Sequence, residues 1–250
     1  MSPPSGPSAI SASPRVHALL ARLHAASEAQ EKSWSQSFFY LKRLIAFYLF
    51  STPWTAGADD HMRDKFVALE EDKCHFMYLL ARAKGALNIV EAGTSFGVST
   101  IYLALAVGQN VADQKALGKT VSGKVIATEK EPSKAARARE HWAEAGDEVA
   151  GIIELREGNL LETLKMEGMP DEVDFLLLDI WTPMALPTLK IIKPRLKKGA
   201  VVLADNTSMA RPMYKEYLDY IHDPANGFKT TEITYAGGLQ MSVYLPEDSN

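Results

Sequence analysis

From residue 87 onwards, the chain alternates short apolar runs with longer segments whose apolar residues follow helical spacing. The apolar runs lack the polar alternation of a half-exposed strand, and this is typical of a parallel sheet covered by helices on both faces. The expected strands are 87–91, 124–128, 152–155, 173–178, 200–204, 229–235 and 240–245. The expected helices between them are 99–107, 132–145, 160–166, 183–196 and 211–222. The last two strands flank Ala236-Gly237-Gly238 and predict a closing hairpin, so the pattern indicates an α/β fold with a mostly parallel seven-stranded sheet.

The residues before this region have a different character. A Ser- and Pro-rich start predicts a disordered tail, whereas residues 14–31 show helical apolar spacing. Residues 34–50 are rich in aromatic side chains, which suit a substrate lid, a dimer interface or plain helix packing, and a third helix is expected to end near Gly85. The predicted organisation is a tail (1–13), an N-terminal helical extension acting as a cap or dimerisation element (14–84) and a core domain (85–250).

Composition and charge narrow the class of protein. Apolar residues make up 46% and charged residues 23% of the chain, as in ordinary globular proteins. The net charge of −4 argues against a nucleic-acid surface, which needs a basic excess. The most apolar stretch, 38–50, is interrupted by Lys42 and Arg43 and is too short to span a bilayer. Since the single cysteine, Cys74, also fits a reducing compartment, we expect a cytoplasmic protein that binds neither nucleic acid nor membrane.

The first strand of the core runs into the segment Glu91-Ala92-Gly93-Thr94-Ser95-Phe96-Gly97-Val98-Ser99. Open parallel sheets bind ligands at the carboxyl ends of their strands, so this loop is a candidate site. Gly93 and Gly97 permit tight turns and a close approach of the backbone, and Glu91 can receive a cation. The loop lacks G-x-G-x-x-G and a Walker lysine. It therefore suits a zwitterionic, sulfonium-bearing ligand better than a dinucleotide, while packing alone is the alternative explanation.

Polar residues at the next two strand ends support an adenosine ligand. Glu129 ends the second strand, where a carboxylate can accept both hydroxyls of a ribose. Glu157-Gly158-Asn159 follows the third strand and is a candidate for adenine contacts.

The fourth and fifth strands end in Asp179 and in Asp205-Asn206. Because these ends lie at one edge of the sheet, the three side chains are expected to converge. Carboxylate and amide oxygens are the ligands that Mg²⁺ and Mn²⁺ prefer. The sequence therefore predicts a divalent metal site.

Together these segments resemble the metal-dependent small-molecule O-methyltransferases typified by catechol O-methyltransferase and caffeoyl-CoA O-methyltransferase. The resemblance covers about residues 70–210 and rests on the Glu91–Ser99 loop, Glu129, Leu178-Asp179-Ile180-Trp181 and Ala204-Asp205-Asn206. It implies a Rossmann-like class I methyltransferase fold, S-adenosyl-L-methionine (SAM) as cofactor, and Mg²⁺ or Mn²⁺.

The resemblance also implies roles for individual residues. Glu91, Gly93 and Ser99 would hold the methionyl part of SAM, Glu129 the ribose, and Gly158, Asn159 and Trp181 the adenine. The full set implied for the cofactor is Glu91, Gly93, Thr94, Ser95, Gly97, Ser99, Glu129, Gly158, Asn159, Asp179 and Trp181. The set implied for the metal is Asp179, Asp205 and Asn206, so Asp179 would act in catalysis through the ion.

One position departs from the family pattern. The catechol enzyme has a lysine base three residues after its first metal-binding Asp, where this chain has Thr182. A threonine hydroxyl cannot replace a lysine amine as general base. Either the metal suffices, or another residue acts, with His61, His75 and Tyr214 as candidates.

Several functions remain open at this point. The first is metal-assisted methylation of a hydroxyl on a small, aromatic acceptor, and the nearest alternative is a metal-independent N-, S- or O-methyltransferase of the same fold. A nicotinamide-dependent oxidoreductase is disfavoured because G-x-G-x-x-G and a Tyr-x-x-x-Lys pair are missing. A non-catalytic SAM-binding protein and a homodimer assembled through residues 34–50 also fit the sequence.

Overall fold

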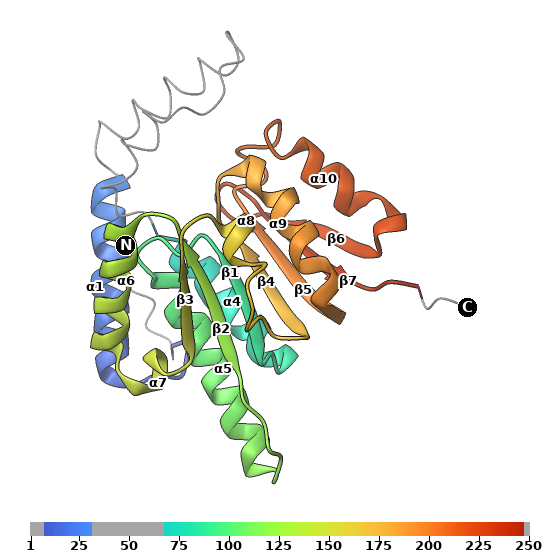
Figure 1. Cartoon of the computed structure of the whole chain (residues 1–250). Coiled ribbons are helices and arrows are strands. Elements are labelled where there is room, and N and C mark those ends of the chain that lie inside the picture. Colours follow the sequence, from blue (N-terminus) through green and yellow to red (C-terminus); the bar gives the residue numbers. More distant parts are fainter. Residues whose placement is uncertain (1–7, 32–67, 248–250) are drawn as a thin grey trace.

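The computed structural model describes residues 8–31 and 68–247, and the aromatic segment 34–50 and His61 lie outside them. The described residues form a seven-stranded sheet in the order β3-β2-β1-β4-β5-β7-β6 (Figure 1). All neighbouring strands are parallel except β7, which is antiparallel to both β5 and β6. The strands are β1 (Asn88–Ala92), β2 (Lys124–Glu129), β3 (Ile153–Glu157), β4 (Val173–Leu178), β5 (Leu196–Asp205), β6 (Phe228–Ile233) and β7 (Leu239–Tyr244). The predicted mostly parallel sheet with a closing hairpin is confirmed.

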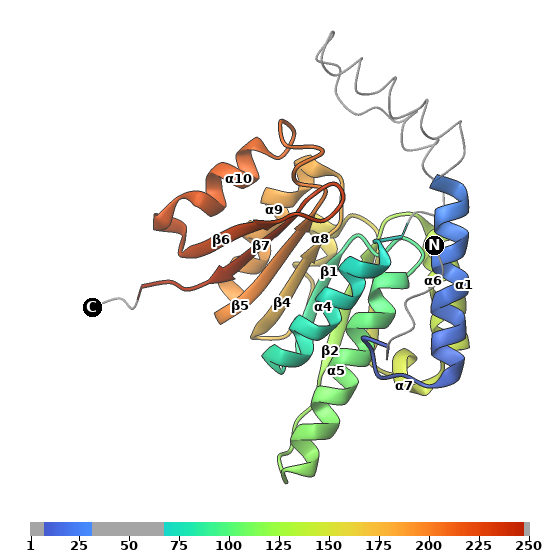
Figure 2. The same ribbon diagram turned by 180° about the vertical axis from the view of Figure 1, so that it is seen from behind.

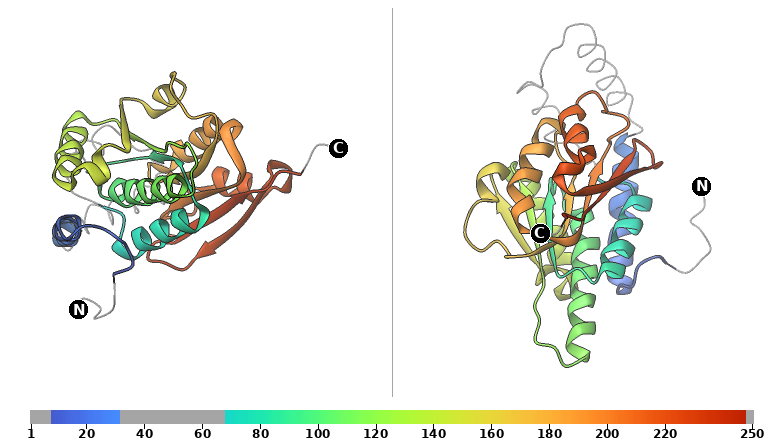
Figure 3. Two further views of the ribbon diagram at one scale, coloured as in Figure 1. Left: turned by 90° about the horizontal axis from the view of Figure 1, so that it is seen from below. Right: turned by 90° about the vertical axis from the view of Figure 1, so that its right-hand side faces the viewer.

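Helices cover both faces of the sheet. They are α1 (Pro14–Glu31), α4 (Glu71–Lys84), α5 (Val98–Ala116), α6 (Pro132–Ala145), α7 (Asp147–Ala150), α8 (Leu160–Thr163), α9 (Ala185–Ile192) and α10 (Lys215–His222). Short 3₁₀ turns occur at Thr182–Met184, Lys193–Arg195 and Pro224–Asn226. The right-hand view of Figure 3 shows α9 and α10 on one side of the strands and α4 and α1 on the other. Among the described residues, no helix is both long and apolar enough to cross a membrane.

The central strands are apolar on both faces because each face has its own core. In β4, Phe175 and Leu177 pack in the cluster formed with α4 and α5, whereas Leu176 and Leu178 pack in the cluster formed with α9 and α10. Alternate side chains of a strand point to opposite faces, so a strand buried on both sides is mostly apolar; its polar exception, Asp174, is buried and accepts hydrogen bonds from the N–H groups of Leu87 and Asn88. This explains the unbroken apolar runs of the sequence.

Helix α1 packs beside α6 at the outside of one helical layer (Figure 2). Its apolar side chains Val16, Leu19, Leu20 and Leu23 are buried in the same core cluster as α4 and α5. Arg15 donates a hydrogen bond from Nη2 to the Ala145 carbonyl oxygen at 2.7 Å. The extension therefore contributes to the core, while the predicted domain boundary at residue 84 stays a prediction.

The closing hairpin is attached to the segment that follows β5. The turn between β6 and β7 provides the Gly237 carbonyl oxygen, which accepts hydrogen bonds from the backbone N–H groups of Ser208 and Met209 at 3.0 and 2.9 Å. Asn206 lies against the same glycine: a Cβ at Gly237 would be 2.3 Å from the Asn206 side-chain oxygen. The segment after β5 and the hairpin turn thus form one packed unit.

His24 makes the stability of the α1 layer depend on pH. Its ring Nε2 lies 2.8 Å from the Tyr102 hydroxyl oxygen, and the side chain is buried. Burial lowers the pKa of His24 below its ordinary 6.5; Glu71 opposes this shift and His75 adds to it. Because the folded state binds this proton less readily than the unfolded state, the stabilisation is complete above pH 6.5 and is lost progressively as the pH falls below that value.

We therefore expect His24→Gln to lose less stability than the wild type on acidification, by at most about 1.4 kcal/mol per pH unit. The measurement is urea unfolding at about pH 7.5 and 5.5. His17→Gln, on the same helix but only partly buried, serves as the control and should behave like the wild type. Equal losses in wild type and His24→Gln would contradict the expectation.

Candidate functional site

The strand order reverses between β1 and β4. The loop that contains Gly93 and Gly97, called the glycine-rich loop below, begins at this point. The loop is fixed to both neighbouring strand ends: the Asp179 N–H donates to the Ala92 carbonyl oxygen at 3.0 Å, and the Thr94 N–H donates to the Thr128 carbonyl oxygen at 2.9 Å. Gly93 has a φ of +91°, and a Cβ there would lie 2.0 Å from the Asp179 carbonyl oxygen. Only glycine allows the loop to pass this close to the end of β4.

Glu91 lies beneath this loop and holds it in shape. Its carboxylate is fully buried and accepts hydrogen bonds from the hydroxyls of Thr94, Ser99 and Thr100 at 2.8, 2.6 and 2.5 Å. Burial raises the pKa of Glu91, and the three hydroxyl bonds oppose that rise. The described partners of Glu91 are thus the hydroxyls of the loop and of the first turn of α5, and its contact with a methionyl group stays a prediction.

Glu129 lies at the end of β2, where the sequence places the ribose contact. One carboxylate oxygen accepts the Ser95 N–H at 2.7 Å and the other accepts the Glu131 N–H at 2.8 Å. Burial raises the pKa of Glu129, against the effect of these N–H donors and of Lys134. The carboxylate is therefore oriented by the backbone next to the glycine-rich loop.

A small cavity joins the loop to the end of β4. Its lining residues are Ala68, Leu69, Thr94, Ser95, Phe96, Val98, Ser99 and Asp179. The structure thereby brings together four of the residues predicted for the cofactor, namely Thr94, Ser95, Ser99 and Asp179. The segment at Ala68 and Leu69, which immediately precedes α4, closes one side, and no sequence motif indicated this contact.

The residues predicted for the adenine lie at the ends of β3 and β4. The Gly158 N–H donates to the Glu129 carbonyl oxygen at 2.9 Å, which places the segment after β3 beside the end of β2. Asn159 caps α8 by accepting the Leu161 N–H at 3.1 Å. Trp181 precedes the first 3₁₀ turn and is 41% exposed.

One charged residue at this edge of the sheet, Lys73 on α4, was not predicted from the sequence. Its side chain is fully buried, and its ammonium nitrogen lies 2.6 Å from Asp205 Oδ1 and 2.9 Å from Glu70 Oε2. Burial opposes the charge of Lys73, but Asp205 and Glu70 outweigh it and raise its pKa. The available signal was the position of Lys73 four residues before Met77, within the stripe of α4 that is otherwise apolar and buried.

The two carboxylates predicted as metal ligands, Asp179 and Asp205, both have raised pKa values. Burial raises the pKa of Asp205 to about 6, even though Lys73 opposes the rise. Burial and then the charges of Asp205, Glu91 and Glu70 raise the pKa of Asp179 well above its usual range. The end of the sheet is therefore crowded with carboxylates.

The predicted ligands Asp179, Asp205 and Asn206 do not fit a resident divalent ion as they are arranged. Both oxygens of Asp205 are engaged: Oδ1 with the Lys73 ammonium, and Oδ2 with the Asn206 amide nitrogen at 2.6 Å. The Asn206 side-chain oxygen faces Gly237 instead of the carboxylates. Within residues 8–31 and 68–247, no group of three or more His, Cys, Asp and Glu side chains is disposed to hold a metal.

Two of the candidate bases, His75 and Tyr214, lie among the described residues, as does Thr182 at the position of the family's lysine. His75 lies 3.8 Å from Glu71 and edge-on to the Tyr102 ring, on the α1 side of α4. Burial raises the pKa of Tyr214, as do the nearby charges of Asp179 and Asp205. Thr182 Oγ1 is buried and has no hydrogen-bond partner among the described residues. None of these contacts identifies a general base.

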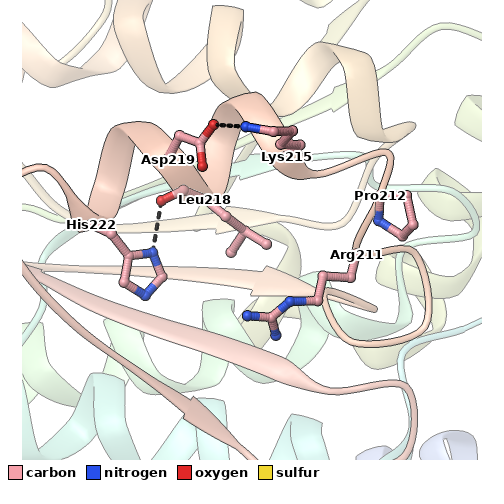
Figure 4. Close-up of a pocket in the computed structure, with 6 residues that line it drawn as sticks. All are labelled: Arg211, Pro212, Lys215, Leu218, Asp219 and His222. Carbon is pink, nitrogen blue, oxygen red and sulfur yellow. Dashed lines mark hydrogen bonds and ion pairs between the residues drawn. The ribbon is translucent and has the colours of Figure 1, made fainter.

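A second depression lies on α10 and is separate from this site (Figure 4). Its lining residues are Arg211, Pro212, Lys215, Leu218, Asp219 and His222. Lys215 pairs with Asp219, and His222 Nδ1 contacts the Leu218 carbonyl oxygen at 2.7 Å. Because its charged groups are paired within the chain and it shares no residue with the first cavity, it is not the candidate active site.

The chain is similar to known methyltransferases in both sequence and structure. Residues 90–207 match a protein family described as a methyltransferase domain. This segment is therefore similar to a methyltransferase domain. It is 32% identical over 141 residues to catechol O-methyltransferase of Mycobacterium tuberculosis, a match that covers 56% of this chain and 57% of that relative. This similarity supports the family predicted from the sequence motifs, the O-methyltransferases typified by catechol O-methyltransferase, and the chain spans just over half the length of that relative.

Solved methyltransferase structures share the fold. The O-methyltransferase TomG of Streptomyces achromogenes, in complex with SAM, superimposes with a TM-score of 0.62 at 22% identity, covering 81% of this chain and 95% of that chain. An O-methyltransferase of Bacillus cereus, in complex with S-adenosylhomocysteine (SAH), gives a TM-score of 0.59 at 19% identity, covering 82% and 97%. At these identities the likeness concerns the fold, and the predicted Rossmann-like class I methyltransferase fold is confirmed.

Proposed function

We propose that this protein is a SAM-dependent O-methyltransferase that acts on a small, hydroxylated aromatic molecule in the cytoplasm. The observation that carries the proposal is the cavity at the strand-order reversal, where the glycine-rich loop, Asp179 and the nearby carboxylate of Glu129 lie in a methyltransferase domain. The relatives named as O-methyltransferases support transfer to oxygen.

The residues of the site suit the parts of the cofactor. When bound, SAM supplies an electrophilic methyl group on a sulfonium centre. Gly93 leaves the space for close backbone approach, and Glu129 can accept hydrogen bonds from two adjacent ribose hydroxyls. Trp181 lies just after the end of β4 and is partly exposed. Positioning of the two reactants in such a site supplies much of the rate enhancement that methyl transfer needs.

The resemblance predicts Mg²⁺ or Mn²⁺ assistance, whereas the contacts of Asp205 favour the metal-independent alternative. Both oxygens of Asp205 are bound by groups of the chain, one of them by a lysine ammonium. We therefore propose methyl transfer through positioning by the protein, with no step assigned to a metal ion.

Calorimetric titration with SAH, followed by transfer of labelled methyl groups from SAM to a panel of phenols, tests the proposal. We expect SAH to bind and at least one phenol to be methylated at oxygen. Absence of SAH binding would overturn the proposed function. Binding without turnover on phenols, amines and thiols would favour a non-catalytic SAM-binding protein.

A further inference from the structure

Lys73 stands out because a lysine side chain that is fully buried has lost all contact with water. An unpaired buried ammonium is strongly unfavourable, so such a group requires close carboxylates. Lys73 has two of them, at 2.6 Å on Asp205 and at 2.9 Å on Glu70. The partners come from the carboxyl end of β5 and from the residue just before α4, which fixes the ammonium between the helix and the sheet.

The surroundings of this ion pair are strongly acidic. Asp205 and Glu70 contact the ammonium directly, and Asp179 follows Leu178, whose partner in the neighbouring strand is Ala204, the residue before Asp205. Such a set of carboxylates requires a compensating positive charge. In the contacts of the described residues, the ammonium of Lys73 provides that charge on Asp205.

A divalent ion and this ammonium compete for the same oxygen. Mg²⁺ binds a carboxylate oxygen at about 2.0–2.1 Å, and it would have to do so on the Asp205 oxygen that Lys73 contacts at 2.6 Å. The other oxygen holds the Asn206 amide nitrogen at 2.6 Å, which turns the Asn206 oxygen away. Like charges this close repel strongly at a buried site. Binding of the ion therefore requires expulsion of Lys73 and reorientation of Asn206.

We propose that Lys73 is the resident cation of this site and takes the place of a divalent metal ion. Its ammonium, fixed by Asp205 and Glu70, neutralises the carboxylate at the end of β5, and the protein works without a metal there. The assignment of the ammonium stands on side-chain contacts alone. Only its consequence for methyl transfer rests on the proposed function.

Titration of Mn²⁺ by electron paramagnetic resonance, on the full chain and without any substrate, tests this proposal. Bound Mn²⁺ loses the spectrum of the free aqueous ion, so binding is measured independently of activity. We expect wild type and Asp205→Asn to behave alike, with no Mn²⁺ site that depends on Asp205. A Mn²⁺ site present in the wild type and lost in Asp205→Asn would overturn the proposal, and this comparison needs no change at Lys73.

Removal of the Lys73 ammonium is expected to increase the affinity for Mn²⁺. Lys73→Met keeps the length of the side chain and leaves the carboxylates unpaired, so Mn²⁺ affinity should rise by about tenfold or more. The double variant Lys73→Met/Asp205→Asn should lose that gain. Lys84→Met, on the same helix but outside the acidic cluster, is the matched control and should bind Mn²⁺ as the wild type does. A folded Lys73→Met protein that gains no affinity would overturn the proposal.

SAH binding separates this proposal from the proposed function. We expect the affinity for SAH to be unchanged by excess EDTA. Loss of SAH binding in EDTA would overturn the assignment of Lys73, whereas a protein that never binds SAH refutes the methyltransferase activity and leaves the Mn²⁺ comparison valid.

Discussion

Gly93→Ala is expected to abolish SAH binding and to destabilise the folded protein by about 2–5 kcal/mol. The added Cβ would lie 2.0 Å from the Asp179 carbonyl oxygen and 2.6 Å from Ile180 Cγ2. A backbone carbonyl at the end of a central strand cannot move aside as a flexible side chain can. The loop must therefore leave its position, and the cavity that it forms with Asp179 is lost. Calorimetric titration with SAH and urea unfolding measure the two effects.

Gly85→Ala provides the matched control. Gly85 ends α4 with a φ of +66°, so the alanine meets the same left-handed strain, yet no atom lies within 4 Å of the added Cβ. The expected loss is about 1–2 kcal/mol, with SAH affinity retained. If Gly93→Ala bound SAH as well as Gly85→Ala does, the close packing of the loop on β4 would have no role in the site.

Glu129→Ala is expected to weaken SAH binding by about 100- to 1000-fold. A carboxylate that accepts two ribose hydroxyls makes charge-assisted hydrogen bonds, each stronger than a neutral one. The same carboxylate also accepts the Ser95 N–H at 2.7 Å, so its removal loosens the glycine-rich loop as well. Glu129→Gln keeps one acceptor oxygen and should show a smaller loss, of about tenfold.

The neighbouring strand offers a control for charge alone. Glu157 ends β3 directly opposite Glu129 in the parallel register, but its side chain is 40% exposed and pairs with Arg139. Glu157→Ala removes the same charge from the same edge of the sheet. Because the Glu157 side chain pairs with Arg139, we expect any adenine contact of this segment to come from Gly158 and Asn159, and SAH affinity to stay unchanged. Similar losses in Glu129→Ala and Glu157→Ala would mean that general electrostatics, rather than a ribose contact, governs binding.

The sheet was predictable because the burial of both faces of a strand is visible in consecutive residues of the sequence. A strand covered on both faces is mostly apolar, so the run 175–178 of β4 and the apolar runs of the other central strands were recognisable from consecutive residues alone. Helix ends were less predictable. The helix expected at 211–222 begins only at Lys215, after a series of turns, and the helix expected at 99–107 continues to Ala116.

Within the site, the sequence indicated the residues that follow one another along the chain. Glu91 and its three hydroxyl partners lie within nine residues of each other, so the loop could be recognised as a unit. The contact of Lys73 with Asp205 joins residues 132 positions apart, and no local pattern specifies which strand end a helix side chain will meet. The divalent-ion prediction rested on Asp179, Asp205 and Asn206, and it could not include the ammonium of Lys73 that lies on Asp205.

The attachment of the closing hairpin to the segment after β5 limits how this protein could be redesigned. Ser208 and Met209 are hydrogen-bonded to Gly237, and Gly238 has no room for a side chain because a Cβ there would meet the Ser208 hydroxyl oxygen at 2.2 Å. A segment grafted after Asn206 from another methyltransferase would arrive without the turn that shapes it. Exchange of acceptor preference between relatives should therefore succeed only when the segment after Asn206 and the turn at Gly237 and Gly238 are transplanted together.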